Sequence, residues 1–315
     1  MERVCPVCGE DVFTAEFGGE RIPGYSLSGA TSELYILERC IGCGMVIGTA
    51  VDDSSVDFDY GDYGEYLTIG EREVQRITGR TQTLNRAHFK LVRMTVGKRA
   101  RIVDFGAGNG IFVAVARASG FDAYGVEPSV MLRKWCREHL GIELFASIDD
   151  ILAPIHVVRM EQVIEHLPPD VSPKIMRDVV SRLSPGGLLI GSTPNYESVN
   201  VALLGARDPA IAPPAHACYF TLHTIDRYLS STIGLEKVFL NTYGARFTSF
   251  MRKEKFTASF LDSVPASYAT KYMVWYPLKV LEKMAGVALR VTKKGYQLQF
   301  AYRKPCPRAI PPSPK

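Results

Sequence analysis

The sequence predicts an α/β protein in which a small cysteine-rich module precedes a mostly parallel sheet. From Arg101 onward, short apolar β-like runs alternate with helix-like segments, the pattern typical of βαβ units and a parallel sheet. Two matched C-x-x-C-G motifs lie within the first 50 residues and indicate the module. A last β-like run, Gln297–Tyr302, is expected to close the sheet as an antiparallel strand.

The composition is that of an ordinary globular protein. The 315 residues are 46% apolar and 22% charged, which excludes a disordered chain, a coiled coil and a collagen-like fibre. A net charge of +4 is too small to indicate nucleic acid by itself. We find no apolar run of roughly 18 residues and no apolar signal segment at the start. We therefore expect a cytoplasmic protein whose thiols stay reduced.

Five segments are expected along the chain. The cysteine-rich module spans 1–50, an acidic tyrosine-rich linker with a helical lead-in spans 51–99, and the alternating core spans 100–245. A helical insertion and the closing strand occupy 246–303, and a proline-rich tail over 304–315 is expected to be disordered. In order, the core elements are expected to be strand Arg101–Phe105, helix Gly110–Ala118, strand Ala123–Val126, helix Ser129–Leu140, strand Ile155–Met160, helix Ser172–Leu183, strand Gly187–Thr193 and helix Thr224–Thr232.

The cysteines of the module have the spacing of metal ligands. A tight turn with two residues between its cysteines presents both sulfurs to one ion, and two such turns complete a tetrahedron. The 31 residues between the motifs require a hairpin insertion, for which Phe17–Ser32 is the candidate. Four unrelated thiols or a redox pair are the alternatives. We predict a closed, structural zinc site formed by Cys5, Cys8, Cys40 and Cys43.

A glycine-rich loop follows the first core strand and precedes a helix. Glycines there permit a tight turn and the close approach of a ligand to bare backbone. Glu127 ends the next strand, 21 residues after Gly106, where a carboxylate can accept hydrogen bonds from both hydroxyls of a ribose. A dinucleotide fingerprint would place its third glycine at Ile111, and Asp104 would repel a pyrophosphate. The loop therefore favours S-adenosylmethionine (SAM) over a nicotinamide cofactor, and a tight turn without a ligand is the remaining alternative.

The segment from about Tyr60 to Tyr243 resembles the class I SAM-dependent methyltransferases, which have a Rossmann-like sheet. In addition to the glycine loop, three matches carry the resemblance: Val126-Glu127-Pro128, Glu165-His166-Leu167-Pro168, and Leu183-Ser-Pro-Gly-Gly187 followed by Ser192-Thr-Pro-Asn195. The cysteine motifs before a tyrosine-rich linker resemble the subset with a zinc-ribbon-like module, which includes sugar C-methyltransferases. The resemblance specifies the cofactor far better than the acceptor.

The resemblance also implies cofactor contacts. Glu127 would hold the ribose, with Pro128 near the adenine and Ile148 and Asp149 flanking it. Met160, Glu161 and Gln162 would pass beside the methionine and the transferring methyl. The methionine part of SAM would be lined by Asp104, Gly106, Ala107, Gly108 and Gly110.

His166 is the candidate base for chemistry beyond the cofactor, with Glu165 beside it. An unperturbed histidine pKa of about 6.5 suits proton abstraction near neutrality. The alternative is that the pair only starts the helix after the third strand. Quinone-biosynthesis-type methyltransferases carry E-x-x-E-H here with a divalent metal, but Gln162 replaces the first acid. A neutral amide is a poor ligand for a hard cation, so we expect no catalytic metal of that kind.

Several polar residues are candidates for facing the acceptor. They are Asn195 and Tyr196 at the end of the fourth strand, His216 and Tyr219 in the stretch before the last core helix, and Tyr63 in the linker. Tyr60, Tyr63 and Tyr66 would either fold over the cofactor or pack the linker. The apolar, basic segment 268–294 would either lie on an anionic membrane surface or pack against the sheet or a second subunit.

The sequence features can be compared with four possible functions. The favoured one is a SAM-dependent methyltransferase acting on a small-molecule, sugar or lipid-linked acceptor at oxygen, carbon or nitrogen. A nicotinamide oxidoreductase is disfavoured by Asp104, and the acidic balance of residues 1–50 disfavours an RNA methyltransferase guided by the zinc module. We expect no nucleic-acid partner. A cofactor-binding protein without catalysis stays open, as does the oligomeric state.

Overall fold

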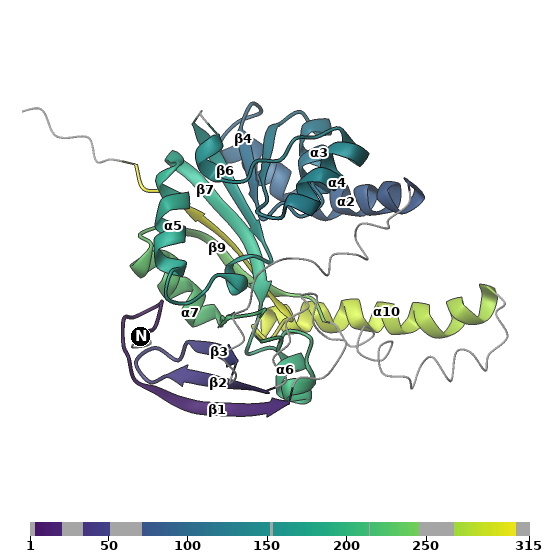
Figure 1. Cartoon of the computed structure of the whole chain (residues 1–315). Helices are drawn as coiled ribbons and strands as arrows, with labels where there is room; N and C mark the ends of the chain where they lie inside the picture. The colour runs from purple at the N-terminus through teal and green to yellow at the C-terminus, as the bar shows by residue number, and fades with distance from the viewer. Residues whose placement is uncertain are drawn as a thin grey trace, which may run out of the picture.

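A six-stranded sheet forms the centre of the molecule. Its strands are β4 (Arg101–Phe105), β5 (Asp122–Val126), β6 (Ile155–Glu161), β7 (Leu183–Pro194), β9 (Glu236–Tyr243) and β10 (Gln297–Arg303). Their order is β5-β4-β6-β7-β10-β9 in the computed structural model (Figure 1), which describes residues 4–20, 34–50, 71–151, 154–213, 215–245 and 268–306. Strands β4 to β7 pair in parallel, and β10 is antiparallel to both neighbours. The predicted mostly parallel sheet with an antiparallel C-terminal strand is confirmed.

Helices cover both faces of this sheet. One face packs against α2 (Glu71–Thr95), α3 (Ile111–Ala118) and α4 (Val130–Leu140), and the other against α5 (Ser172–Ser181) and α7 (Leu222–Arg227). Because side chains alternate along a strand, neighbouring apolar residues serve opposite faces. Ile102 belongs to the cluster under α2, α3 and α4, whereas Val103 belongs to the cluster under α5 and α7.

The N-terminal module shares a sheet with the core. Its strands are β1 (Phe13–Glu20), β2 (Leu34–Cys40) and β3 (Val46–Ala50), and they are completed by β8 (Cys218–Tyr219) from the segment before α7. β1 and β2 pair antiparallel, as the expected hairpin requires, and residues 21–33 lie outside the described residues. The purple strands lie beside α6 (Val199–Leu204) and α7 in Figure 1. The module is therefore joined to the core by backbone pairing.

Several boundaries differ from the sequence prediction. The helix expected to reach Leu183 ends at Ser181, and β7 begins at Leu183 rather than at Gly187. The last core helix is split into α7 and a π-helical turn, η4 (Tyr228–Thr232). Glu165 and His166 lie in a separate short 3-10 turn, η2 (Ile164–His166), rather than in the first turn of α5. The remaining short helices are η1 (Ile148–Asp150) and η3 (Gly205–Arg207).

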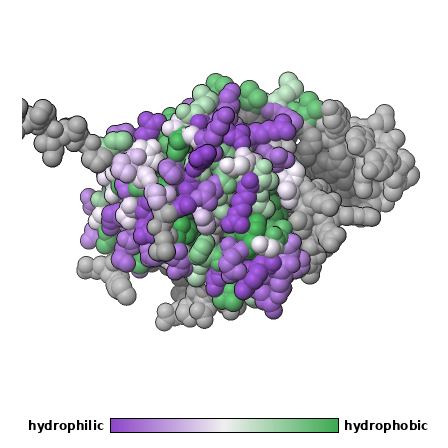
Figure 2. Space-filling model, turned by 90° about the horizontal axis from the view of Figure 1, so that it is seen from above, coloured by the Kyte–Doolittle hydropathy of each residue, from purple (hydrophilic) through white to green (hydrophobic). Residues whose placement is uncertain are grey.

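A long helix, α10 (Tyr268–Val291), connects β9 to β10 and projects from the body of the molecule (Figure 1). Among the described residues, no helix combines the length and apolar character needed to cross a bilayer. On the face drawn in Figure 2, hydrophilic and hydrophobic residues are interspersed. The predicted linker tyrosines Tyr60, Tyr63 and Tyr66 lie outside the described residues, as does the tail from 307 onward.

Candidate functional site

A cavity of about 520 Å³ opens where β4, β5 and β6 end. Ligands of open α/β sheets bind outside the carboxyl ends of the strands, so this is the expected place for a cofactor. The lining includes eight residues that the sequence predicted for cofactor or chemistry: Gly106, Gly108, Glu127, Pro128, Ile148, Asp149, Gln162 and His166. Five other predicted residues are not part of this lining: Asp104, Ala107, Gly110, Glu161 and Glu165.

The loop between β4 and α3 requires glycine at two positions for different reasons. Gly110 caps α3 with φ 74°, and a Cβ there would overlap the Cys136 sulfur. Gly108 has φ 54°, but nothing lies within 4 Å of where its Cβ would be. Gly110 therefore permits close packing of the loop against α4, while Gly108 leaves the backbone open toward the cavity.

Glu127 is held firmly at the end of β5. Its Oε2 accepts a hydrogen bond from the Gly108 amide at 2.8 Å, and its Oε1 accepts one from the Ser129 amide at 3.0 Å. Burial raises the pKa of this carboxyl, and the two backbone amides oppose that shift. The carboxylate thus links the glycine loop to the start of α4 at the cavity wall.

Asp104 is engaged in a buried ion pair that the sequence analysis did not foresee. Arg159 Nη1 donates to Asp104 Oδ1 at 2.6 Å, and its guanidinium carbon lies 4.0 Å from the centre of the Phe112 ring. Arg159 Nη2 also lies 3.5 Å from Glu161 Oε2. Burial raises the pKa of the Asp104 carboxyl, although Arg159 acts in the opposite direction.

Gln162 has an unusual backbone at the cavity wall. Its φ is 55°, in the left-handed region that residues other than glycine seldom adopt. Its Nε2 donates to Ser192 Oγ at 3.0 Å, and its backbone amide donates to the Ser192 carbonyl at 2.9 Å. Two bonds to β7 thus hold the residue in this conformation, which turns the chain from β6 into η2.

Glu165, His166 and His216 converge beside the cavity. A carboxylate oxygen and one ring nitrogen of each histidine lie within 4.8 Å of one another, and the two imidazoles meet edge to face at 4.8 Å. Burial raises the pKa of Glu165 to about 8 and lowers that of His166. Burial, followed by the charge of His166, lowers the pKa of His216 to about 3. Both imidazoles are therefore neutral at pH 7.

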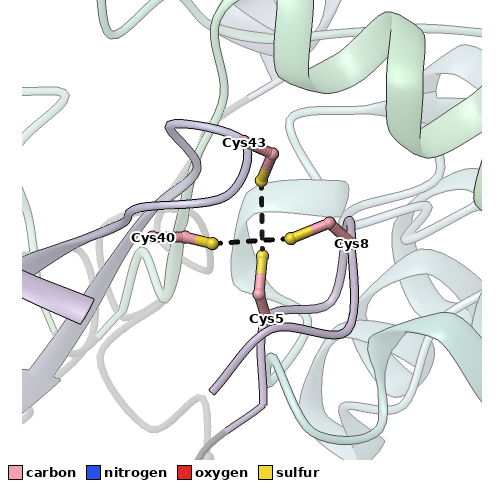
Figure 3. A group of neighbouring side chains, drawn as sticks. All are labelled: Cys5, Cys8, Cys40 and Cys43. Atoms are coloured by element: carbon pink, nitrogen blue, oxygen red, sulfur yellow. Dashed lines mark hydrogen bonds between the residues drawn. The ribbon is translucent and has the colours of Figure 1, made fainter. Parts of the chain in front are cut away.

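The four cysteines of the module lie together in crossed pairs (Figure 3). The Cys5–Cys43 and Cys8–Cys40 sulfur pairs are both 3.5 Å apart, and all four sulfurs lie within 4.8 Å of one another. A tetrahedron with Zn–S bonds of about 2.3 Å has sulfurs about 3.8 Å apart, so the set is compatible with zinc. Gly9 and Gly44, each directly after a second cysteine, have φ of 82° and 77°, as the turns were expected to need. With every position filled by sulfur, the site is a structural one.

The chain matches the model of a family described as a methyltransferase domain over residues 79–238, just over half of its length. The chain belongs to this methyltransferase family. Among curated proteins, no sequence matches the chain. The enzyme is a SAM-dependent methyltransferase, and SAM is its cofactor.

Solved structures resemble the chain only at low sequence identity. A SAM-dependent methyltransferase from Archaeoglobus fulgidus is 16% identical, covers 71% of this chain and 94% of its own, and has a TM-score of 0.46. A SAM-dependent methyltransferase from Mesorhizobium loti is 15% identical, with 69% and 97% covered and a TM-score of 0.42. A cyclopropane synthase from Mycobacterium tuberculosis is 15% identical, with 69% and 83% covered and a TM-score of 0.43.

The residues predicted to face the methyltransferase acceptor lie in different surroundings. His216 lies beside His166, and Tyr219 packs edge to face with Tyr196 at 5.6 Å, with its hydroxyl unpartnered among the described residues. Asn195 is occupied structurally, because its Nδ2 donates to the Gly295 carbonyl at 2.8 Å and its Oδ1 accepts from the Glu197 amide. Tyr63 lies outside the described residues.

Sequence reasoning missed Arg159, the most deeply buried arginine or lysine among the described residues. The signal was present, because Arg159 is the one basic residue among the apolar positions of Val157–Met160. A charge in a buried strand requires a partner. Asp104 occupies the neighbouring parallel strand in direct register with it.

Proposed function

We propose that this methyltransferase acts on a small-molecule, sugar or lipid-linked acceptor, with Glu165 and His166 as its acid/base pair. The nucleophilic atom of the acceptor would attack the SAM methyl group in line, while the C–S bond breaks and its electrons return to sulfur. The proton released by the acceptor would pass to His166. One observation carries the proposal: a neutral histidine with a free ring nitrogen lines the cofactor cavity.

The hydrogen bond of His166 supports this role. Its Nδ1 lies 2.7 Å from the Ala215 carbonyl oxygen, which can only accept, so the proton resides on Nδ1. The lone pair on Nε2 is therefore available to take a proton. Glu165 lies beside it with an oxygen that has no hydrogen-bond partner among the described residues.

The cofactor contacts proposed for SAM follow the cavity wall. Glu127 would exchange part of its bonding to the loop for the ribose hydroxyls, and the open backbone at Gly108, together with Gly106, would face the methionine. Ile148 and Asp149 would flank the adenine from the far side of the cavity. His216, Tyr196 and Tyr219 would border the acceptor.

Calorimetric titration with S-adenosylhomocysteine (SAH), with NAD in parallel, tests the cofactor. We expect SAH to bind and NAD not to bind. A screen of sugar and lipid-linked acceptors with methyl-labelled SAM then tests the chemistry. His166→Asn is expected to lower the rate about 10²- to 10⁴-fold with SAH affinity unchanged, the usual range for loss of a general base. His223→Asn, at an exposed histidine, is the matched control.

A peripheral membrane contact through α10 is the second part of the proposal, and it would bring a lipid-linked acceptor within reach. The support is an exposed apolar face, within the described part of α10, beside the basic residues Lys283 and Arg290. A basic amphipathic helix of this kind binds anionic lipid surfaces. Exposed fractions run from 40% to 76% for Val280, Leu281, Met284, Val287 and Val291.

Vesicle sedimentation tests this contact. The protein is expected to sediment with anionic phospholipid vesicles and to lose this property when Met284 and Val287 are both changed to Glu. Met94→Glu, at a residue of α2 with 75% exposure, should leave sedimentation unchanged. Equal sedimentation of all three proteins would contradict the proposal.

A further inference from the structure

Three electron-pair donors face one another in the cluster of Glu165, His166 and His216. They come from two segments about fifty residues apart, η2 and the loop before β8, that the fold brings together. The two histidines are half-buried, whereas Glu165 is 1% exposed. His166 also lines the cofactor cavity, so one side of the cluster is open to a ligand.

Backbone carbonyls fix the protonation of both imidazoles. His166 Nδ1 donates to the Ala215 carbonyl at 2.7 Å, and His216 Nδ1 donates to the Ala210 carbonyl at 2.8 Å. Each Nε2 therefore carries a lone pair and no proton. Histidines that bind metals are oriented in this way, since their other ring N–H donates to a carbonyl or a carboxylate.

Glu165 adds a third acceptor to these two. Its Oε2 accepts from Thr193 Oγ1 at 3.0 Å, but its Oε1 is buried and has no hydrogen-bond partner among the described residues. A buried carboxylate oxygen without a donor is costly. Two imidazole lone pairs and this oxygen thus meet with no N–H donor between them. Because burial raises the pKa of Glu165 to about 8, a proton on its carboxyl fills this place in the metal-free protein, and a cation would displace that proton.

We propose that Glu165, His166 and His216 form a second metal site, for a divalent transition ion such as Zn²⁺, separate from the four-cysteine site. Two imidazoles and one carboxylate are an established ligand set for zinc, with the fourth position left for a further ligand. A harder ion such as Mg²⁺ would prefer oxygen ligands and waters, which this set does not supply. The free side of the ion would face the cofactor cavity.

The inference rests on the proposed function in one respect. A metal-bound Nε2 cannot take a proton, so the ion and the acceptor's proton compete for His166. Zinc beyond one equivalent per chain is therefore expected to slow methyl transfer, and a chelator that removes only the weaker ion should restore it. Zinc that accelerates the reaction would contradict the base role of His166 and leave the metal site intact.

Zinc counting tests the site without an acceptor. The full chain is loaded with Zn²⁺, freed of unbound ion by gel filtration and analysed by mass spectrometry of the metal. We expect two zinc ions per chain in the parent protein, one in His216→Ala and Glu165→Gln, and two in the control His223→Ala. Loss of one ligand is expected to weaken binding at the second site at least about 100-fold.

Two further readouts keep the test independent of folding and of the proposed function. SAH affinity should be equal in all four proteins, which shows that the variants are folded. Cobalt substitution should retain thiolate-to-metal absorption from the cysteines in every variant, while His216→Ala loses one equivalent of cobalt. One zinc per chain in the parent protein, or two in both variants, would overturn the inference. Failure of SAH to bind would instead contradict the proposed function.

Discussion

The two halves of the cavity are built differently. The cofactor half comes from one continuous stretch, in which Glu127 closes on the Gly108 amide only 19 residues earlier. The proposed acceptor half consists of η2, which lines the cavity, and the loop before β8, whose His216 lies beside His166; β8 is itself paired with β3 of the N-terminal module. The first half is local and the second depends on distant parts of the chain. The two halves should therefore fail separately.

A series of backbone hydrogen bonds links the module to the acceptor half. The Gly48 amide donates to the Ala217 carbonyl at 3.0 Å, and the Ala217 amide donates to the Glu165 carbonyl at 2.9 Å. The same segment supplies the Ala215 carbonyl that orients His166. The zinc module thus positions the proposed acid/base pair, although it lies far from it in sequence.

Loss of the structural zinc is expected to have the largest effect and to separate the two halves. Cys8→Ser removes one of four thiolates, and zinc binding contributes roughly 10 kcal/mol or more to folding in small zinc peptides. We expect residues 34–50 and 215–220 to lose hydrogen-exchange protection and methyl transfer to be abolished. SAH affinity should stay within about twofold, because the hydrogen bonds that hold Glu127 come from the Gly108 and Ser129 amides and not from the module.

Cys306→Ser is the control for that experiment, since Cys306 is exposed and outside the cysteine cluster. It should leave exchange, zinc content and activity unchanged. A Cys8→Ser protein that exchanges like the parent would show that β3 and β8 hold the module without metal. Loss of SAH binding in Cys8→Ser would break the distinction between the two halves.

The second prediction concerns the buried ion pair between Arg159 and Asp104. Arg159→Met should lower the free energy of unfolding by about 3–5 kcal/mol, because it leaves the Asp104 carboxylate buried without its partner. Denaturant unfolding measures the change. Lys174→Met removes an exposed ion pair with Asp178 and should cost below about 1 kcal/mol.

A double variant sharpens this prediction. Asp104→Leu combined with Arg159→Met removes both charges and should recover most of the lost stability, since apolar replacement of a buried pair is often neutral. If the double variant is as unstable as Arg159→Met, the loss comes from the packing of Arg159 on Phe112 rather than from the stranded charge.

The difference between the halves also explains what the sequence could predict. The spacing of the four cysteines was enough to predict them as a metal site. The order of strand, loop and helix was enough to predict Gly106, Gly108 and Glu127, because these residues lie close together in the sequence. The class of fold and the parallel sheet followed from alternation of local patterns. The precise roles within the site stay predictions, but eight of the proposed residues do line one cavity.

Other features had no local signal. β8 is two residues long, too short to show periodicity, so its pairing with β3 could not be expected from the sequence. The meeting of His166 with His216 depends on that pairing. The role of Arg159 could not be predicted because a buried strand is identified by its apolar residues. A charged residue within it is explained only when its partner is known, and Asp104 lies opposite it on the neighbouring strand.

The third prediction tests the cofactor half directly. Glu127→Ala should weaken SAH binding by about 1.5–3 kcal/mol for each hydrogen bond lost to the ribose, roughly ten- to a hundredfold or more. Calorimetry measures it, and Glu143→Ala, at an exposed glutamate in a surface ion pair with Arg137, is the control. Unchanged SAH affinity in Glu127→Ala would contradict the ribose role. Zinc content should be unaffected, because the module does not depend on this half.

The smallest expected effect lies outside both halves and gives a baseline for them. Burial would raise the pKa of Asp226, but bonds from Lys237, Tyr302 and Ser230 outweigh it, so the folded pKa lies below the ordinary 3.8. A depressed folded pKa contributes stability above the unfolded value, and this contribution is lost as the pH falls below about 4. Because the pair with Lys237 is partly exposed, we expect less than about 1 kcal/mol. Asp226→Asn should flatten the unfolding profile between pH 4 and pH 2 relative to the parent protein, with no change at pH 7 in SAH affinity or zinc content. A change in either would mean that this surface network is coupled to the cavity, against the separation proposed for its two halves.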